Sequence, residues 1–248
     1  MAKNYWNIVD NVIRNSDVII EVLDARFIEE TRNKELDNRI KSMNKKIIYA
    51  INKSDLIDTF VDDIILGFKN YVFVSAKKNL GTTRLRNMIR NISDKKPLTV
   101  GVVGYPNTGK SSIINSLKHK KSAATSPVAG FTKGMQKIKV SDDVYLIDTP
   151  GVIHYSLEDE AFQVMINAKD INKIKDYEAV ALKIIKHVTH VRPEVLERLY
   201  GIKIKENPEN TLEEIAKKFN WLMKGGKLNL ELASKRIIGD WQKGNIRL

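Results

Sequence analysis

The chain has 248 residues, 42% of them hydrophobic and 29% charged, which is enough for one large domain or for one domain and a smaller companion. Cysteine is absent, so disulfides and thiolate-bound metals are excluded, and no apolar run approaches the roughly 18 residues of a membrane-spanning helix. The N-terminus also lacks an apolar secretory signal, so we expect a cytoplasmic protein without a membrane partner.

The formal net charge of +12 is distributed unevenly. Between residues 77 and 141 the only acidic residue is Asp94, and it stands against fourteen basic residues: Lys77, Lys78, Arg84, Arg86, Arg90, Lys95, Lys96, Lys110, Lys118, Lys120, Lys121, Lys133, Lys137 and Lys139. One nucleotide with its magnesium ion does not need so much positive charge. The segment therefore indicates a polyanionic partner, of which nucleic acid is the commonest. The alternative is a basic surface that only keeps the protein soluble.

The first 150 residues read as alternating strands and helices. The predicted strands are Asp17–Asp24, Lys46–Ile51, Tyr71–Val74, Leu98–Val103 and Val144–Ile147, with helix-like stretches at Leu56–Phe68 and Thr83–Ile92. Nearly continuous apolar strands that alternate with helices predict a mostly parallel sheet covered on both faces. Such sheets bind ligands at the carboxyl ends of their strands.

Beyond about residue 165 the pattern becomes helical throughout. One helix is expected to contain Val180, Ile184, Ile185 and Val188, and a second to begin at Pro193 and end at Gly201. A third is expected to begin with a capping box at Thr211–Glu214 and to end by Gly225–Gly226, and a fourth to run from Leu230 to Trp241. We therefore predict an α/β domain over residues 1–165 and a small all-helical domain over residues 166–248.

A phosphate-binding loop is predicted at Gly104–Ser111, because this segment follows a strand, begins a helix and matches the P-loop pattern. Glycines let the backbone curl around phosphates, and successive N–H groups then face the anion. Lys110 is expected to reach the β- and γ-phosphates, and the Ser111 hydroxyl to ligate magnesium.

A second motif, Asp148–Gly151, follows the last predicted strand. A carboxylate at that strand end can hold magnesium opposite Ser111, and Gly151 can offer its N–H to the γ-phosphate. The same tetrapeptide alone would also suit an ordinary turn.

Two further motifs at strand ends predict recognition of guanine. In Asn52–Asp55, the Asp55 carboxylate can accept hydrogen bonds from both donors on the guanine edge, and the stem of Lys53 can lie on the purine face. Ser75–Lys77 can close the pocket with a backbone N–H. Their order is unusual, because in an ordinary Ras-like domain the guanine motifs follow the P-loop. Circular permutation can preserve the sheet while it moves the chain ends.

These motifs, together with Asp24–Arg26 and Pro127–Thr132, resemble the circularly permuted GTPases of the YlqF/YawG (RbgA-like) type across nearly the whole first domain. The C-terminal Lys224–Gly226 and Asp240–Trp241 are similar to the helical domain of the same family. The resemblance implies a GTPase that docks on the precursor of the large ribosomal subunit and binds ribosomal RNA. It also implies that Thr132 ligates magnesium when GTP is bound.

Two features bear on the rate of hydrolysis. Val152 stands where Ras-type enzymes place a glutamine that orients water, so slow intrinsic hydrolysis is expected. Similar GTPases use an asparagine at the position of Asn107 to hold K⁺, although Asn107 can equally be a turn residue. Some bacterial relatives carry an N-terminal histidine that assists hydrolysis, and this chain has none there. His154 can assist hydrolysis in its place, and the alternative is that His154 is an ordinary surface histidine.

The complete expectation is a Ras-like P-loop GTPase sheet with circularly permuted motifs, followed by an RNA-binding helical domain. It binds GTP or GDP with Mg²⁺ and a candidate K⁺, acts as a monomer on the large subunit and its RNA, and does not bind DNA. The expected nucleotide-binding residues are Asn52, Lys53, Ser54, Asp55, Ser75, Ala76, Lys77, Asn107, Thr108, Gly109, Lys110, Ser111, Ser112 and Gly151. Hydrolysis is assigned to Asn107, Lys110, Thr132 and Gly151, and magnesium to Ser111, Thr132 and Asp148. The alternative is a nucleotide-regulated binding module that signals to a protein partner with negligible hydrolysis.

Overall fold

The computed structural model describes residues 2–57, 66–118, 125–126, 136–148 and 159–248. It divides into two compact units. Unit 1 comprises residues 1–55 and 60–155, and unit 2 comprises residues 56–59 and 156–248. Within the described ranges, no helix is both long enough and apolar enough to cross a membrane.

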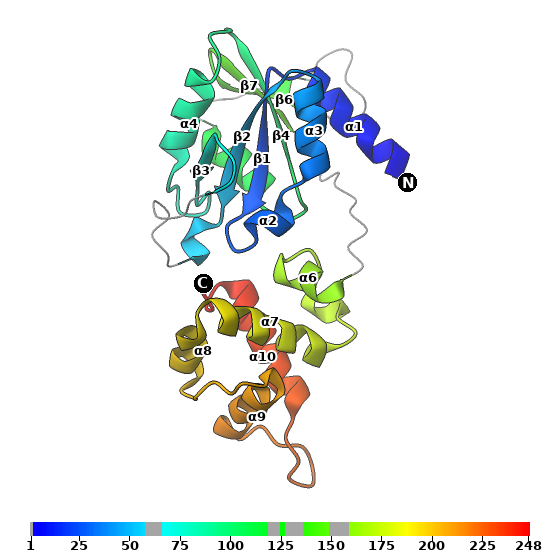
Figure 1. The fold of residues 1–248 in the computed structure, drawn as a ribbon, viewed down its shortest axis with the longest axis vertical. Coiled ribbons are helices and arrows are strands. Elements are labelled where there is room, and N and C mark those ends of the chain that lie inside the picture. The colour runs from blue at the N-terminus through cyan, green and yellow to red at the C-terminus, as the bar shows by residue number, and fades with distance from the viewer. Residues whose placement is uncertain (1, 58–65, 119–124, 127–135, 149–158) are drawn as a thin grey trace. The chain divides into compact units, whose positions relative to one another are not determined.

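Unit 1 is built on a seven-stranded sheet with the order β3-β2-β1-β4-β7-β6-β5 (Figure 1). Its strands are β1 (Val18–Asp24), β2 (Lys46–Asn52), β3 (Tyr71–Phe73), β4 (Leu98–Gly104), β5 (Thr125–Ser126), β6 (Gln136–Ser141) and β7 (Val144–Asp148). The five strands from β3 to β7 in this order are parallel, whereas β6 and β5 are antiparallel. The predicted α/β sheet is confirmed, and β5 and β6 extend it beyond the strands that the sequence predicted.

The helices of unit 1 cover both faces of the sheet. They are α1 (Ala2–Arg14), α2 (Ile28–Thr31), α3 (Lys34–Ser42), α4 (Thr82–Asn91) and α5 (Lys110–Leu117), with a 3-10 turn, η1 (Ser54–Leu56). Buried residues of α4 and α5 pack on Ile20 and Val100 from one face. Those of α1 and α3 pack on Ile19 and Val103 from the other, as alternation along a strand requires. Each such buried aliphatic side chain contributes about 1.5–3 kcal/mol.

The expected helix at Leu56–Phe68 lies largely outside the described residues. Its beginning is the short turn η1, and residues 66–68 are not helical.

Apart from one isolated bridge between Leu222 and Leu228, the regular secondary structure described in unit 2 is helical. Its helices are α6 (Glu160–Met165), η3 (Ile171–Lys173), α7 (Tyr177–Val191), α8 (Pro193–Tyr200), α9 (Pro208–Lys218) and α10 (Leu230–Lys243). Trp241 is fully buried among them and donates a hydrogen bond from Nε1 to the carbonyl oxygen of Met165 at 2.8 Å. This bond places α6 in unit 2, whereas the expected boundary at residue 165 assigned it to the first domain. Gly201 ends α8 in the left-handed conformation, as predicted.

The capping box expected at Thr211 is wrong. Asn207 caps α9 instead, because its side chain accepts a hydrogen bond from the N–H of Glu209 and Pro208 takes the first helical position. Thr211 is buried inside the helix. Its hydroxyl accepts from the N–H of Lys205 at 3.0 Å and so fixes the segment that leads into α9.

Candidate functional site

The carboxyl ends of four neighbouring strands bring the sequence motifs to one edge of the sheet. Asp24 at the end of β1 pairs in register with Asn52 at the end of β2. On the other side of β1, Val22 pairs with Gly104 at the end of β4, whose Val102 pairs with Asp148 at the end of β7. The permuted chain therefore assembles its predicted motifs at a single edge, where parallel sheets bind ligands.

The P-loop needs glycine at two positions in this structure. A Cβ on Gly104, where φ is +144°, would lie 2.5 Å from the carbonyl oxygen of Val22. A Cβ on Gly109, where φ is +98°, would overlap with Nδ2 of Asn52. Glycine alone accommodates this backbone, because side chains disfavour positive φ and would fill the space. The loop geometry fits a phosphate cradle at the N-terminus of α5.

Lys110 lies at the first position of α5 and is buried. Its Nζ donates hydrogen bonds to the carbonyl oxygens of Gly104 at 2.9 Å and Tyr105 at 2.7 Å. The Thr108 hydroxyl donates to the same Tyr105 carbonyl at 2.9 Å. The ammonium group is thus held inside the curve of the loop, where a phosphate of a bound nucleotide would be recognised.

Asn107 lies at the outside of the loop, with an exposed side chain and a φ of +59°. Asparagine adopts this left-handed conformation more readily than most residues, as a turn position requires. Both interpretations of Asn107, as a turn residue and as a K⁺ ligand, are compatible with this placement. Ser111 and Ser112 are exposed on the first turn of α5.

Asn52 joins the guanine motifs to the P-loop. Its Nδ2 donates to the carbonyl oxygen of Thr108 at 2.8 Å, and its Oδ1 accepts from the N–H of Ala76 at 3.1 Å. The side chain is buried, so both bonds form where water does not compete. The sequence identified Asn52 as part of a motif, but it did not reveal that one amide connects three loops.

The Ser75 hydroxyl orients Asp55. It donates to Oδ1 of Asp55 at 2.7 Å and accepts from the N–H of Lys78 at 3.1 Å. The backbone N–H of Ser54 also donates to the carbonyl oxygen of Val74 at 3.1 Å. These bonds fix the predicted base-reading carboxylate against the Ser75–Lys77 segment, whereas Lys77 itself is exposed.

Asp24 is a positioning residue that the sequence indicated only through the family resemblance. Its buried carboxylate contacts Nη2 of Arg26 at 2.9 Å and Nζ of Lys53 at 2.7 Å. Burial alone would raise the pKa of Asp24, but the charges and hydrogen bonds of Arg26 and Lys53 outweigh it and lower that pKa to about 2. The ion pair fixes the stem of Lys53, which was predicted to lie on the purine.

Several predicted residues lie outside this description. Thr132, Gly151, Val152 and His154 fall in ranges that the structure does not describe. Asp148 ends β7, and only its backbone is described. The magnesium set and the switch residues therefore remain predictions.

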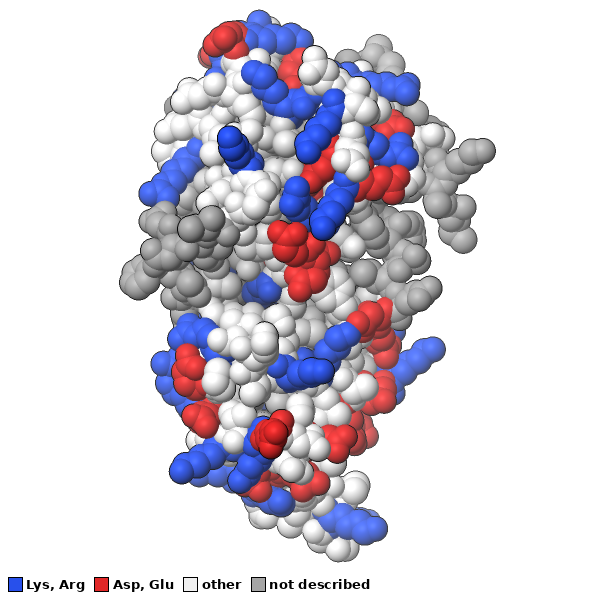
Figure 2. Space-filling model, viewed as in Figure 1, with Lys and Arg blue, Asp and Glu red and all other residues white. Residues whose placement is uncertain are grey.

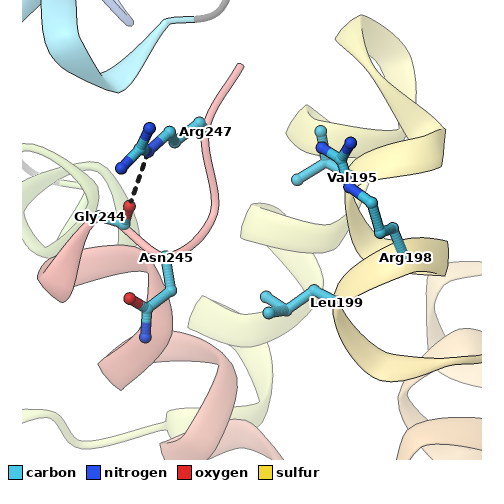
Figure 3. A pocket seen from close by; sticks show the side chains of 6 residues that line it. All are labelled: Val195, Arg198, Leu199, Gly244, Asn245 and Arg247. Atoms are coloured by element: carbon cyan, nitrogen blue, oxygen red, sulfur yellow. Dashed lines mark hydrogen bonds between the residues drawn. The ribbon is translucent and has the colours of Figure 1, made fainter.

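A separate cavity of about 480 Å³ is lined entirely by residues of unit 2, so it is not part of the P-loop site (Figure 3). The guanidinium groups of Arg198 on α8 and Arg247 after α10 line it together with Leu199. Nε of Arg247 donates a long hydrogen bond to the carbonyl oxygen of Gly244 at 3.5 Å.

Comparison with known proteins agrees with these motifs. The family model of the 50S ribosome-binding GTPases matches residues 99–220, a range that starts at the P-loop strand and excludes the guanine motifs that precede it here. The chain is 41% identical over 247 residues to the uncharacterized GTP-binding protein MJ1464 of Methanocaldococcus jannaschii, covering 96% of this chain and 65% of that protein. It is 34% identical over 263 residues to nucleolar GTP-binding protein 2 of Saccharomyces cerevisiae, covering 99% of this chain and 52% of that protein. The chain thus spans less than two thirds of the length of these curated relatives.

The fold is shared with solved structures of YlqF. The GNP-bound YlqF from T. maritima aligns with a TM-score of 0.62 and 24% identity, covering 99% of this chain and 95% of that one. A GDP-bound YlqF structure aligns with a TM-score of 0.64 at the same identity, covering 96% and 95%. This likeness supports the predicted circularly permuted α/β fold.

Proposed function

We propose that the chain is a circularly permuted GTPase of the YlqF type, and that it binds and hydrolyses GTP as an assembly switch on the large ribosomal subunit. The observation that carries this proposal is the double hydrogen bond of Asn52 to Thr108 and Ala76, which draws the base-reading and phosphate-binding loops together. A phosphate loop alone would fit many nucleotides. A phosphate loop tied to a positioned Asp55 favours guanine.

The proposed roles follow from the placement of each residue. Asp55 reads the guanine edge, and Lys53 packs on the purine with its ammonium held by Asp24. Lys110 exchanges its carbonyl partners for the β- and γ-phosphates. Charge on the transferring phosphate is stabilised by preorganised donors, which is the main source of catalysis in this reaction class.

Magnesium is assigned to Ser111, Asp148 and Thr132. The strand register supports the first pair, because β4 leads into the P-loop and lies beside β7, whose last residue is Asp148. The bound ion would neutralise charge on the phosphates during hydrolysis. Thr132 and Gly151 complete this proposal as the groups that respond to the γ-phosphate.

Because the intrinsic rate of hydrolysis is expected to be slow, we propose two activators. Val152 has no polar atom to orient water, so a ribosomal particle and K⁺ held near Asn107 are proposed to raise turnover. Ribosomal RNA is the proposed ligand of unit 2 and of the basic segment 77–141. The relative from Saccharomyces cerevisiae is named as nucleolar, whereas a cytoplasmic location remains our proposal for this chain.

The decisive experiment is GTP turnover measured with and without purified large ribosomal subunits in KCl. We expect slow hydrolysis alone and at least tenfold stimulation by the particles, with small subunits as the matched control. Binding to GTP without hydrolysis under every condition would instead support the alternative, a nucleotide-regulated module for a protein partner. Turnover that large and small subunits stimulate equally would contradict the assembly role.

A further inference from the structure

A short hairpin follows α9 in unit 2, and it is held by its own backbone (Figure 1). We call residues 218–228, which begin with the last residue of α9, the tip hairpin. The N–H of Met223 donates to the carbonyl oxygen of Lys227 at 2.7 Å, and Leu222 forms an antiparallel bridge with Leu228. Gly225 and Gly226 turn the chain with φ values of +91° and +77°. The hairpin therefore presents its side chains from a fixed frame.

The side chains that the tip hairpin presents are apolar and exposed. Phe219 is 42% exposed although its ring stacks on Trp221, with centroids 4.8 Å apart and an interplanar angle of 15°. Tyr200 meets Phe219 edge-on at 6.3 Å. Leu222 is 47% exposed and Met223 is 51% exposed. An ordered, exposed apolar cluster of this kind marks an interaction site.

Charge on the tip hairpin has one sign. Lys218, Lys224 and Lys227 are exposed, and among the described residues no carboxylate forms an ion pair with them. Lys217 differs, because it is 3.5 Å from Glu213 and 3.3 Å from Glu214. The sequence contains no acidic residue between positions 214 and 231. Figure 2 shows basic side chains beside uncharged atoms at the end of unit 2 where the hairpin lies.

We propose that the tip hairpin binds an unpaired stretch of RNA, with nucleobases packed on its aromatic and apolar side chains and phosphates contacted by its three lysines. Stacking on Phe219 suits any base, because every base has a π-face, and lysines neutralise phosphates whatever the sequence. Paired bases cover one another's faces, so the apolar cluster requires a single strand, bulge or loop. The inference rests on the proposed function and adds to it the place and the kind of RNA that unit 2 recognises.

A protein partner would suit these side chains less well. It would need an apolar patch ringed by acids to match the three lysines, whereas RNA supplies anionic charge and flat apolar faces along its whole length. The observations therefore favour RNA as the ligand of the tip hairpin.

The test uses the full chain and a fluorescein-labelled single-stranded RNA of roughly twelve nucleotides, a length within the usual site size. Phe219→Leu keeps apolar volume but removes the ring, Phe219→Trp keeps an aromatic face, and Met223→Ser changes an exposed position. Lys224→Glu with Lys227→Glu reverses two charges. The matched control is Lys186→Glu with Lys243→Glu, which makes the same charge change at exposed positions of the same unit. Thermal unfolding of every variant checks its fold.

We expect Phe219→Leu to weaken RNA binding about tenfold without changing the salt dependence, and Phe219→Trp to retain affinity. Met223→Ser should weaken binding several-fold. The double reversal at positions 224 and 227 should flatten the slope of log affinity against log salt by about one to two, and the control pair should change it less. The same RNA annealed into a duplex should bind more weakly.

Equal RNA affinity of the tip-hairpin variants and the control pair would overturn the inference, as would wild-type preference for the duplex. If the tip hairpin docks on a protein instead, its variants and the control pair bind RNA with equal affinity. The wild-type protein alone tests the proposed function. If that function is wrong, the wild type neither sediments with large subunits nor hydrolyses GTP faster in their presence. If the wild type does both while the tip-hairpin variants bind RNA normally, only the inference fails.

Discussion

Asn52 donates a hydrogen bond from Nδ2 to the carbonyl oxygen of Thr108 at 2.8 Å, across 56 residues of sequence. With the bond from Ala76, one side chain fixes the distance between the base-reading loop and the phosphate loop. Asn52→Ala should therefore weaken GTP binding about tenfold, since each buried bond contributes about 0.5–1.5 kcal/mol net. Equilibrium titration with a fluorescent GTP analogue measures this. Asn38→Ala, at an exposed position of α3, is the control, and equal losses in both would disprove the bridging role.

Base selectivity should depend on Asp55. In Asp55→Asn an amide replaces the carboxylate that pairs with two guanine donors, so GTP should bind about ten- to a hundredfold more weakly, or roughly 1–3 kcal/mol. Xanthosine triphosphate, whose added carbonyl can accept from the amide, should bind the variant better than GTP. Competition titrations with both nucleotides provide the measurement. Unchanged GTP affinity would remove the guanine assignment.

The cation prediction concerns Asn107. If its side chain helps to hold K⁺, turnover should be faster in KCl than in NaCl at equal ionic strength, and Asn107→Ala should abolish the difference while nucleotide still binds. Asn79→Ala, another exposed asparagine with positive φ, is the matched control. Wild-type turnover that ignores the cation, even with large subunits present, would assign Asn107 to the turn alone.

RNA is also expected to contact the basic segment of unit 1. Reversing Lys118, Lys120 and Lys121 to glutamate should weaken binding to large subunits several-fold and flatten its salt dependence, because fewer counterions are released. GTP affinity should change little, since Lys110 and the loop amides are untouched. Sedimentation with subunits at several salt concentrations tests this. If the triple variant binds large subunits as tightly as the wild type does at low salt, the basic segment is only a solvated surface.

Acid stability should report the ion pairs of Asp24. Its carboxyl has a pKa lowered from 3.8 to about 2, so its stabilisation is complete above pH 3.8 and is lost as the pH falls toward 2. Asp24→Asn leaves Arg26 buried beside a neutral amide and should cost about 3–5 kcal/mol at pH 7. Asp10→Asn breaks a part-exposed pair with Arg39 and should cost about 0–1 kcal/mol. Urea unfolding between pH 2 and pH 7 compares them, and equal costs would contradict the prediction.

How far the sequence predicted the molecule depends on whether the signal was local. Strands β1, β2 and β4 were predicted because they are continuous apolar runs, and the P-loop because its glycines have fixed spacing. One local signal was missed: α1 was not predicted, although Trp6, Val9 and Ile13 recur at helical spacing and Ile13 is fully buried. The boundary of unit 2 was misplaced, because the bond between Trp241 and Met165 joins residues 76 positions apart.

The candidate site shows the same limit. The pattern identified Asn52, Asp55 and Ser75 as nucleotide-binding residues, which remains a prediction. It could not reveal that Ser75 orients Asp55 or that Asn52 reaches Thr108, since no short pattern encodes partners on other strands. The false capping box at Thr211 is instructive, because Pro208 had already fixed an earlier helix start.

The position of β4 has a consequence for synthesis of the protein. This strand lies between β1 and β7, so the sheet edge that gathers the motifs closes only when β4 has been made. In the permuted chain the guanine motifs at Asn52–Asp55 and Ser75–Lys77 emerge before the P-loop at Gly104–Ser111, since chains are made from the N-terminus and domains form as units. The nascent chain therefore displays its base-reading loops before it can hold a phosphate, and it can capture a nucleotide only once the P-loop has followed them.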